Sequence, residues 1–66
     1  MARKWVIEGR DYMDDFAPYF LPGEFNSQEQ AEAAARKRAE QQERRTGWFP
    51  DPLFTVSPDG ERHAVT

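Results

Sequence analysis

The chain has 66 residues, a net charge of −3, one histidine, no cysteine and nine aromatic residues. This length allows a single domain and excludes folds that need roughly 200 residues or more, such as the (β/α)8 barrel. The absence of cysteine excludes disulfides and, with a single histidine, a zinc site built from Cys and His. No apolar run approaches the ~18 residues of a membrane span, and no signal-peptide core follows the basic N-terminus. We therefore expect a cytoplasmic protein.

Residues 3–8 (RKWVIE) alternate in character, with Trp5 and Ile7 on one side and Val6 and Glu8 on the other. This period of two predicts a strand, which we expect to end at Gly9.

Residues 9–26 show no clean period and read as an aromatic and acidic loop. Pro22 and Gly23 suit the centre of a type II turn. One helical turn within residues 11–16 and a short strand at residues 19–21 both fit this segment, so the sheet has three strands or four.

Residues 28–45 are strong helix formers without Gly or Pro. Ser27 and Gln30 form a capping box before this helix, and Gly47 follows it as a C-cap. Its apolar stripe is made of Ala31, Ala34, Ala35 and Ala39, and Gln42 continues it. We expect large side chains of the sheet to face this stripe, namely Trp5, Ile7, Phe54 and Val56, with Phe25 and Trp48 as further candidates.

Residues 53–65 predict a hairpin, because Ser57-Pro58-Asp59-Gly60 is a strong β-turn signal between two strand-like runs. The fold class is then α+β: residues 1–66 form one small domain with an Ala-faced helix on a mainly antiparallel sheet of three or four strands. The expected order is β-(β)-α-β-β.

The string Tyr12-Met13-Asp14-Asp15 resembles the YMDD motif of reverse transcriptases, but only these four residues match, and that family needs a far larger domain. The carboxylates of Asp11, Asp14 and Asp15 lack the spacing of a calcium loop. Ser27 is used as a cap, and His63 has no evident nucleophile beside it. We therefore expect no catalytic, metal or cofactor site, and no enzyme.

The aromatic and acidic residues are the most informative feature, because Tyr, Trp, Phe and Met are enriched at protein interfaces. They either complete the core or form a partner-docking patch, and both readings stay open. The candidate partner-binding residues are Asp11, Tyr12, Met13, Asp14, Asp15, Phe16, Tyr19, Phe20, Trp48 and Phe49. The leading hypothesis is an inhibitor or adaptor that docks on another protein with a basic surface, steered by its acidic groups.

Two alternatives remain. The first is a nucleic-acid-binding domain that uses the basic helix residues Arg36, Lys37, Arg38, Arg44 and Arg45, although glutamates interrupt them. The second is a structural homodimer in which sheets or aromatic loops pair.

Residues 24–40, with the capped and alanine-rich phrase EFNSQEQAEAAAR, resemble the helix of small bacterial β-β-α-β-β domains and of the arm-binding domains of phage integrases. Integrase arms are basic, whereas this chain is acidic. Small size and acidity are also similar to phage inhibitors of host defence, including anti-CRISPR proteins, which implies an inhibitory role.

Overall fold

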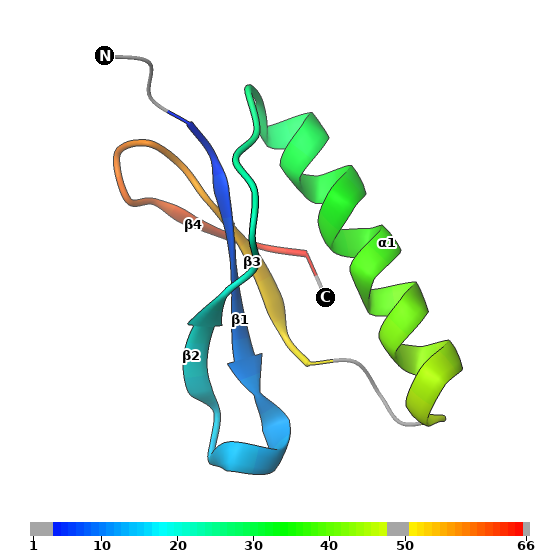
Figure 1. Cartoon of the computed structure of the whole chain (residues 1–66). Coiled ribbons are helices and arrows are strands. Elements are labelled where there is room, and N and C mark those ends of the chain that lie inside the picture. Colours follow the sequence, from blue (N-terminus) through cyan, green and yellow to red (C-terminus); the bar gives the residue numbers. More distant parts are fainter. Residues whose placement is uncertain (1–3, 48–50, 66) are drawn as a thin grey trace.

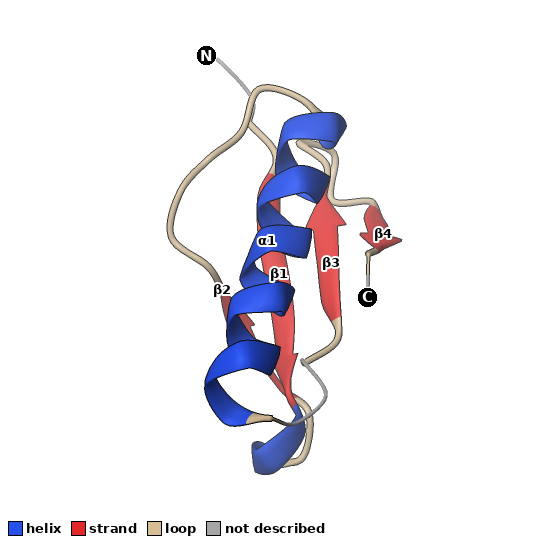
Figure 2. Ribbon diagram, turned by 90° about the vertical axis from the view of Figure 1, so that its right-hand side faces the viewer, coloured by secondary structure: helices blue, strands red, loops and turns tan. Residues whose placement is uncertain are grey.

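The computed structural model describes residues 4–47 and 51–65, and its elements follow one another along the chain as Figure 1 shows. They are β1 (Val6–Asp11), the single 3-10 turn η1 (Tyr12–Asp14), β2 (Ala17–Phe20), α1 (Gln28–Thr46), β3 (Leu53–Val56) and β4 (Arg62–Ala64). The four strands form one antiparallel sheet in the order β2-β1-β3-β4. Helix α1 lies along one face of this sheet, across β1 and β3 (Figures 1 and 2). The predicted α+β class is confirmed, with four strands.

Helix α1 begins and ends at the predicted caps. The Ser27 hydroxyl accepts a hydrogen bond from the Gln30 backbone N–H at 3.2 Å, and the Gln30 side-chain carbonyl accepts one from the Asn26 N–H at 3.1 Å. Gly47 adopts φ 72° and donates its N–H to the Glu43 carbonyl at 2.8 Å. These bonds satisfy backbone groups that a helix end leaves without partners, so the boundaries follow from local sequence.

The core lies between the alanine stripe of α1 and the sheet. Ile7 and Leu53 are almost fully buried against Ala31, Ala35 and Ala39. The partly buried side chains around them are Trp5, Leu21, Phe25, Ala34 and Val65. Small residues on the helix let it approach the sheet closely and accept larger side chains from it, as predicted.

The prediction that Phe54 and Val56 face the helix is wrong. Leu53 and Thr55, both fully buried, occupy that face, and Phe54 pairs with Glu8 on the other side. Because side chains alternate along a strand, a shift of one residue exchanges the two faces. Trp48, the other predicted contact, lies outside the described residues.

The first strand also differs from its prediction. It starts at Val6, while Trp5 and Phe25 form an isolated bridge through two backbone hydrogen bonds of 2.8 and 2.9 Å. It does not end at Gly9, which pairs with both Tyr19 of β2 and Leu53 of β3. A Cβ atom at Gly9 would lie 2.3 Å from the Tyr19 ring, so glycine is needed here because an aromatic ring crosses the backbone.

Residues 9–26 are therefore not one long loop. They contain the end of β1, then η1 and β2. A helical turn is present within residues 11–16, and a second strand is present but spans Ala17–Phe20 instead of residues 19–21. The final hairpin is confirmed: the Gly60 N–H donates to the Ser57 carbonyl at 2.9 Å and closes the predicted turn between β3 and β4.

Candidate functional site

The connection between β1 and β2, residues 12–16, is here named the hairpin tip. The Asp11 side chain accepts a hydrogen bond from the Met13 N–H at 3.0 Å and so starts the turn η1. The Phe16 N–H then donates to the Asp11 carbonyl at 2.8 Å and returns the chain to β2. Asp15 and Phe16 have φ values of 58° and 61°, the left-handed region. That region costs an L-residue roughly 1–2 kcal/mol, so the tip is a strained connection.

The hairpin tip exposes large hydrophobic side chains. Tyr12, Met13 and Phe16 are 58%, 85% and 52% exposed. The rings of Tyr12 and Phe16 meet edge to face, with centroids 6.0 Å apart and an interplanar angle of 83°. Asp14 and Asp15 are exposed between them. Five consecutive residues thus present two aromatic rings, a thioether and two carboxylates to the outside.

A buried polar cluster holds the base of the hairpin tip. The Asp51 carboxylate accepts hydrogen bonds from the Tyr12 N–H at 3.1 Å, the Tyr19 hydroxyl at 2.8 Å and the Gln42 side-chain amide at 3.2 Å. The Asp51 N–H donates in turn to the Gln42 side-chain carbonyl at 3.0 Å. One side chain therefore links the hairpin tip, β2 and the last turns of α1 just before β3 begins.

The charges in this cluster are set by its surroundings. Burial by itself raises the pKa of Asp51, but the hydrogen bonds from the Tyr12 N–H, Tyr19 and Gln42 outweigh it and hold the pKa below its ordinary value. Burial and then the hydrogen bond to Asp51 raise the pKa of Tyr19 to about 12. At neutral pH Asp51 is ionised, and the Tyr19 hydroxyl is a hydrogen-bond donor within the fold.

The predicted partner-binding residues fall into four places. Tyr12, Met13, Asp14, Asp15 and Phe16 come together on the hairpin tip. Phe20 is 63% exposed but lies on the face of the sheet away from α1, since it pairs with Glu8. Asp11 and Tyr19 are half-buried and bonded within the domain. Trp48 and Phe49 lie outside the described residues.

Sequence reasoning missed Asp51. The signal that could have found it is Gln42, a polar side chain that continues an alanine stripe and therefore points toward the interior. A buried amide requires partners, and Asp51 supplies both an acceptor and a donor.

The acidic residues do not form a metal site in the described part of the chain. Among residues 4–47 and 51–65, no three His, Asp or Glu side chains come close enough to share an ion. The carboxylates of Asp11, Asp14 and Asp15 are thus adjacent in sequence without converging.

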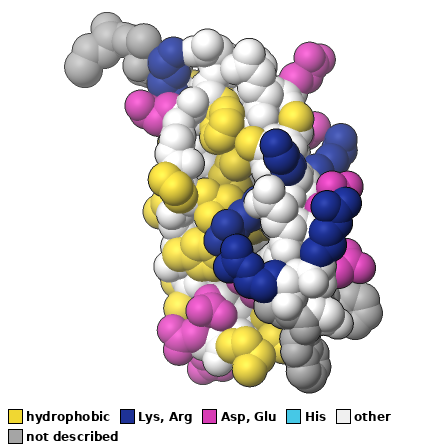
Figure 3. Space-filling view, turned by 45° about the vertical axis from the view of Figure 1, so that its right-hand side comes forward, with side chains coloured by type: hydrophobic (Ala, Val, Ile, Leu, Met, Phe, Trp, Pro, Cys, Tyr) yellow, Lys and Arg dark blue, Asp and Glu magenta, His cyan; other side chains and the backbone are white. Residues whose placement is uncertain are grey.

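The five basic residues of α1 point in different directions. Arg38 and Arg45 border one depression together with Gln41 and Gln42. Arg44 lies among Glu40, Glu43 and Gly47 at the end of the helix. Arg36 is 3.9 Å from Glu32, one turn before it, and Lys37 is exposed. Figure 3 shows Lys and Arg side chains mixed with Asp and Glu on this side of the molecule.

An apolar groove of about 290 Å³ runs between α1 and the segment that connects β2 to it. Its lining consists of Ile7, Leu21, Pro22, Phe25, Ala34 and Arg38. In Figure 3 this region appears as a band of hydrophobic side chains beside the basic residues of the helix. The groove is an apolar surface with a single guanidinium on its border.

Within residues 4–47 and 51–65, no helix is both long and apolar enough to cross a membrane. Comparison of the chain with family models, with curated proteins and with solved structures finds no match. The resemblance to integrase arms, bacterial domains and phage inhibitors gains no support from these comparisons. A functional proposal therefore has to rest on the chemistry of the surface.

Proposed function

We propose that the protein is a small non-catalytic module that docks on another protein in the cytoplasm through its hairpin tip, as an inhibitor or adaptor. The observation that carries this proposal is the exposure of Tyr12, Met13 and Phe16. Of the four large hydrophobic side chains exposed among the described residues, three stand on these five consecutive positions. Aromatic residues and methionine are enriched at the centres of interfaces, where their burial supplies most of the binding energy.

The backbone of the hairpin tip supports the same proposal. Strained residues persist only where the surrounding structure holds them, and they concentrate at functional sites. Here the Asp51 cluster holds the start of the loop, and the hydrogen bond from Phe16 to Asp11 holds its end. A loop fixed in this way loses little conformational entropy on binding, which favours affinity.

The carboxylates of Asp14 and Asp15 indicate a partner with a basic surface. Exposed charges of this kind raise the association rate more than they raise the affinity. With Asp14 and Asp15 both replaced by Asn, we expect association to slow at low salt and to differ little at high salt. An association rate that is unchanged at low salt would count against electrostatic steering.

Site-specific photo-crosslinking tests the docking role. A photoreactive phenylalanine analogue replaces Met13 in the full chain, and the matched control carries it at Asp59, exposed in the turn between β3 and β4. After irradiation in nuclease-treated lysate of the source cells, we expect one discrete protein adduct from position 13 and none from position 59. The same adducts from both positions, or none from either, would overturn the proposal.

The same experiment separates the alternatives. An adduct at twice the mass of the chain would support the homodimer. An adduct that forms only when nuclease is omitted would move the function to nucleic acid and to the basic residues of α1.

A further inference from the structure

The face of the sheet away from α1 is here named the open face. In the described part of the chain α1 is the only helix longer than a single turn, and it covers the opposite face (Figures 1 and 2). Strand alternation places Glu8 and Arg10 of β1 on the open face, together with Phe20, Phe54 and Arg62 of the other three strands. This face combines aromatic rings with arginines, the two side-chain types that dominate interface energetics.

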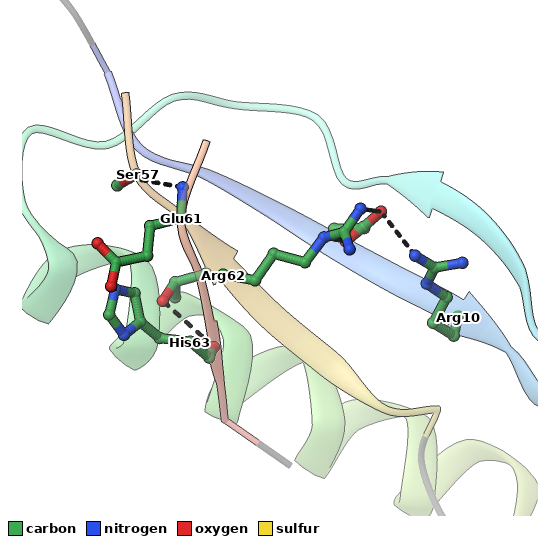
Figure 4. Close-up of polar contacts among 7 residues, drawn as sticks. Arg10, Ser57, Glu61, Arg62 and His63 are labelled. Atoms are coloured by element: carbon green, nitrogen blue, oxygen red, sulfur yellow. Dashed lines mark hydrogen bonds and ion pairs between the residues drawn. The ribbon is translucent and has the colours of Figure 1, made fainter. Parts of the chain in front are cut away.

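Glu8 is a buried carboxylate at the centre of the open face. Its side chain is only 3% exposed, and the strand register sets Phe20 on one side of it and Phe54 on the other. The Arg62 Nε atom lies 2.7 Å from Glu8 Oε1, and an Arg10 guanidinium nitrogen lies 3.4 Å from Glu8 Oε2. Figure 4 shows the long Arg62 side chain extending across the sheet in the direction of Arg10. Glu8 thus positions two guanidinium groups.

Arg10 and Arg62 keep the capacity to pair with a further anionic group. Two guanidinium groups meet one carboxylate, so the charged strand residues of the open face sum to one positive charge in a chain whose net charge is −3. The side chains of Arg62 and Arg10 are 56% and 30% exposed. A guanidinium carries several N–H donors in a planar fork that matches a carboxylate, and Glu8 engages only some of them.

We propose that the open face is a second docking surface, which receives an acidic segment of a partner protein. Carboxylates of that segment pair with Arg10 and Arg62, and its apolar side chains pack on Phe20 and Phe54. Glu8 acts as a positioning residue, because it holds both guanidinium groups before the partner arrives and so reduces the entropy lost on binding. The open face would thus select a negatively charged partner segment, whereas the hairpin tip would select a partner with a positively charged surface.

The charges favour this occupant over two others. In a twofold dimer that pairs the two open faces, both surfaces carry the same net positive charge, and this opposes their association. A nucleic acid needs many phosphate contacts to bind, and the net negative charge of the chain opposes it. A short acidic and apolar protein segment requires only the local positive charge, the exposed ring of Phe20 and the half-buried ring of Phe54.

Nuclear magnetic resonance titration of the ¹⁵N-labelled full chain tests the proposal. The probe is a synthetic peptide that alternates Glu with Leu and Phe, and its control replaces every Glu by Gln. We expect the acidic probe to shift the signals of Arg62, Phe20 and Phe54, and to bind about tenfold more tightly than the Gln peptide, because charge-assisted hydrogen bonds are lost in the latter. Equal binding of the two peptides, or shifts confined to α1 and its groove, would overturn it.

Matched variants locate the effect. Phe20→Ala removes an exposed ring on an edge strand and should weaken binding of the acidic probe several-fold, while Phe16→Ala, a similarly exposed ring on the hairpin tip, should leave it unchanged. Arg62→Gln should weaken it by about tenfold, and Arg45→Gln on α1 should have no effect. Arg62→Gln also leaves Glu8 without its closest partner, which could disturb the fold. The second variant is therefore Arg62→Lys, which keeps the positive charge beside Glu8 but lacks the planar set of N–H donors of a guanidinium.

The peptide titration and the crosslinking experiment test the open face and the hairpin tip independently of each other. Loss of the crosslink from position 13 with intact peptide binding would refute only the tip, and the reverse result would refute only the open face. A single-stranded oligonucleotide that shifts the open-face signals when the acidic probe does not would overturn the proposal in favour of a nucleic acid. A concentration-dependent shift of the same signals without any probe would overturn it in favour of a dimer.

Discussion

The two hairpins of the sheet are closed in opposite ways. Between β3 and β4, Ser57 and Gly60 close a four-residue turn, and the Ser57 hydroxyl also accepts the Glu61 N–H at 3.0 Å. The connection between β1 and β2, the hairpin tip, has five residues like the connection between β3 and β4, but two of them are non-glycine residues with left-handed backbone angles. The first connection uses residues that turns favour, with Gly60 at φ 90° where a side chain would be strained. The second uses large hydrophobic residues where a polar turn would cost less.

The comparison shows that the hairpin tip is not the connection of lowest free energy between its two strands. Exposed aromatic groups and strained angles give the isolated domain no stability, so their energy must be offset elsewhere in the fold. The Asp51 cluster is the visible compensation, since it binds the Tyr12 backbone and the neighbouring β2 to the end of α1. A surface loop maintained at such a cost is consistent with a role in docking.

Removing the anchor is expected to have the largest effect. Asp51→Ala removes the acceptor of the half-buried Tyr19 hydroxyl and the hydrogen bonds from the Tyr12 N–H and the Gln42 side-chain amide, so the free energy of unfolding should fall by about 1–3 kcal/mol. Urea denaturation measures this loss. The matched control is Asp14→Asn, an exposed carboxylate on the hairpin tip, which should change stability by less than about 0.5 kcal/mol. A loss of similar size in both variants would show that Asp51 does not anchor the first hairpin.

Crowding the centre of β1 is expected to come next. Gly9→Ala places a methyl group where the Tyr19 ring now lies, and displacing that ring should lower the stability by about 1–3 kcal/mol. Thermal unfolding followed by circular dichroism checks the effect. In a Tyr19→Ala background the same substitution should cost much less, since the ring is gone. Equal costs in the two backgrounds would show that the ring contact is not the cause.

The pH dependence of stability sharpens the comparison further. The pKa of Tyr19 is about 12 in the fold against 10.0 in the unfolded chain, so between these values the folded state binds more protons. The contribution of Tyr19 is therefore fully present below pH 10 and is lost as the pH rises toward 12. The lowered pKa of Asp51 has the opposite sign: its contribution is present above an unfolded pKa of 3.8 and is lost as acid titrates the folded carboxylate.

Urea midpoints recorded across both pH windows test these signs. Tyr19→Phe should flatten the alkaline loss that the parent chain shows between pH 10 and pH 12. An alkaline loss of the same size in the variant would assign that titration to another group.

Relieving the strain of the hairpin tip is expected to have the smallest effect on stability. Phe16→Gly removes the steric conflict at φ 61° but adds entropy to the unfolded chain, so the net change should lie within about 1 kcal/mol of zero, on the stabilising side. Asp14→Gly, at a position in η1 without positive φ, should instead destabilise by about 0.5–1 kcal/mol. Denaturation of the two variants side by side measures the difference. Equal destabilisation would mean that Phe16 is not strained.

Around the hairpin tip, the local sequence predicted which residues could bind a partner, but not which of them would be exposed and which would be bonded within the domain. Tyr12 to Phe20 could all be read as core or as interface, because an aromatic residue suits both. Tertiary contacts divided them: Tyr19 joined Asp51 in the interior, Phe20 turned to the open face, and Tyr12, Met13 and Phe16 stayed exposed. Asp51 itself lies nine residues beyond its partner Gln42 and carries no local signal for that pairing.

The sequence by itself determined the elements whose causes are local. Helix α1 is set by Ser27, Gly47 and an unbroken run of helix formers, and the last hairpin is set by the turn at residues 57–60. Only the tertiary structure decided the register of β3 and the position of Gly9 inside β1, since each depends on residues far along the chain. Asp51, Leu53 and Thr55 lie on the face toward α1, where Asp51 bonds to Gln42 and the other two are buried in the core. Because side chains alternate along the strand, Phe54 and Val56 lie on the opposite face. Propensity acts within a few residues, whereas strand faces are chosen by what the opposite layer can satisfy.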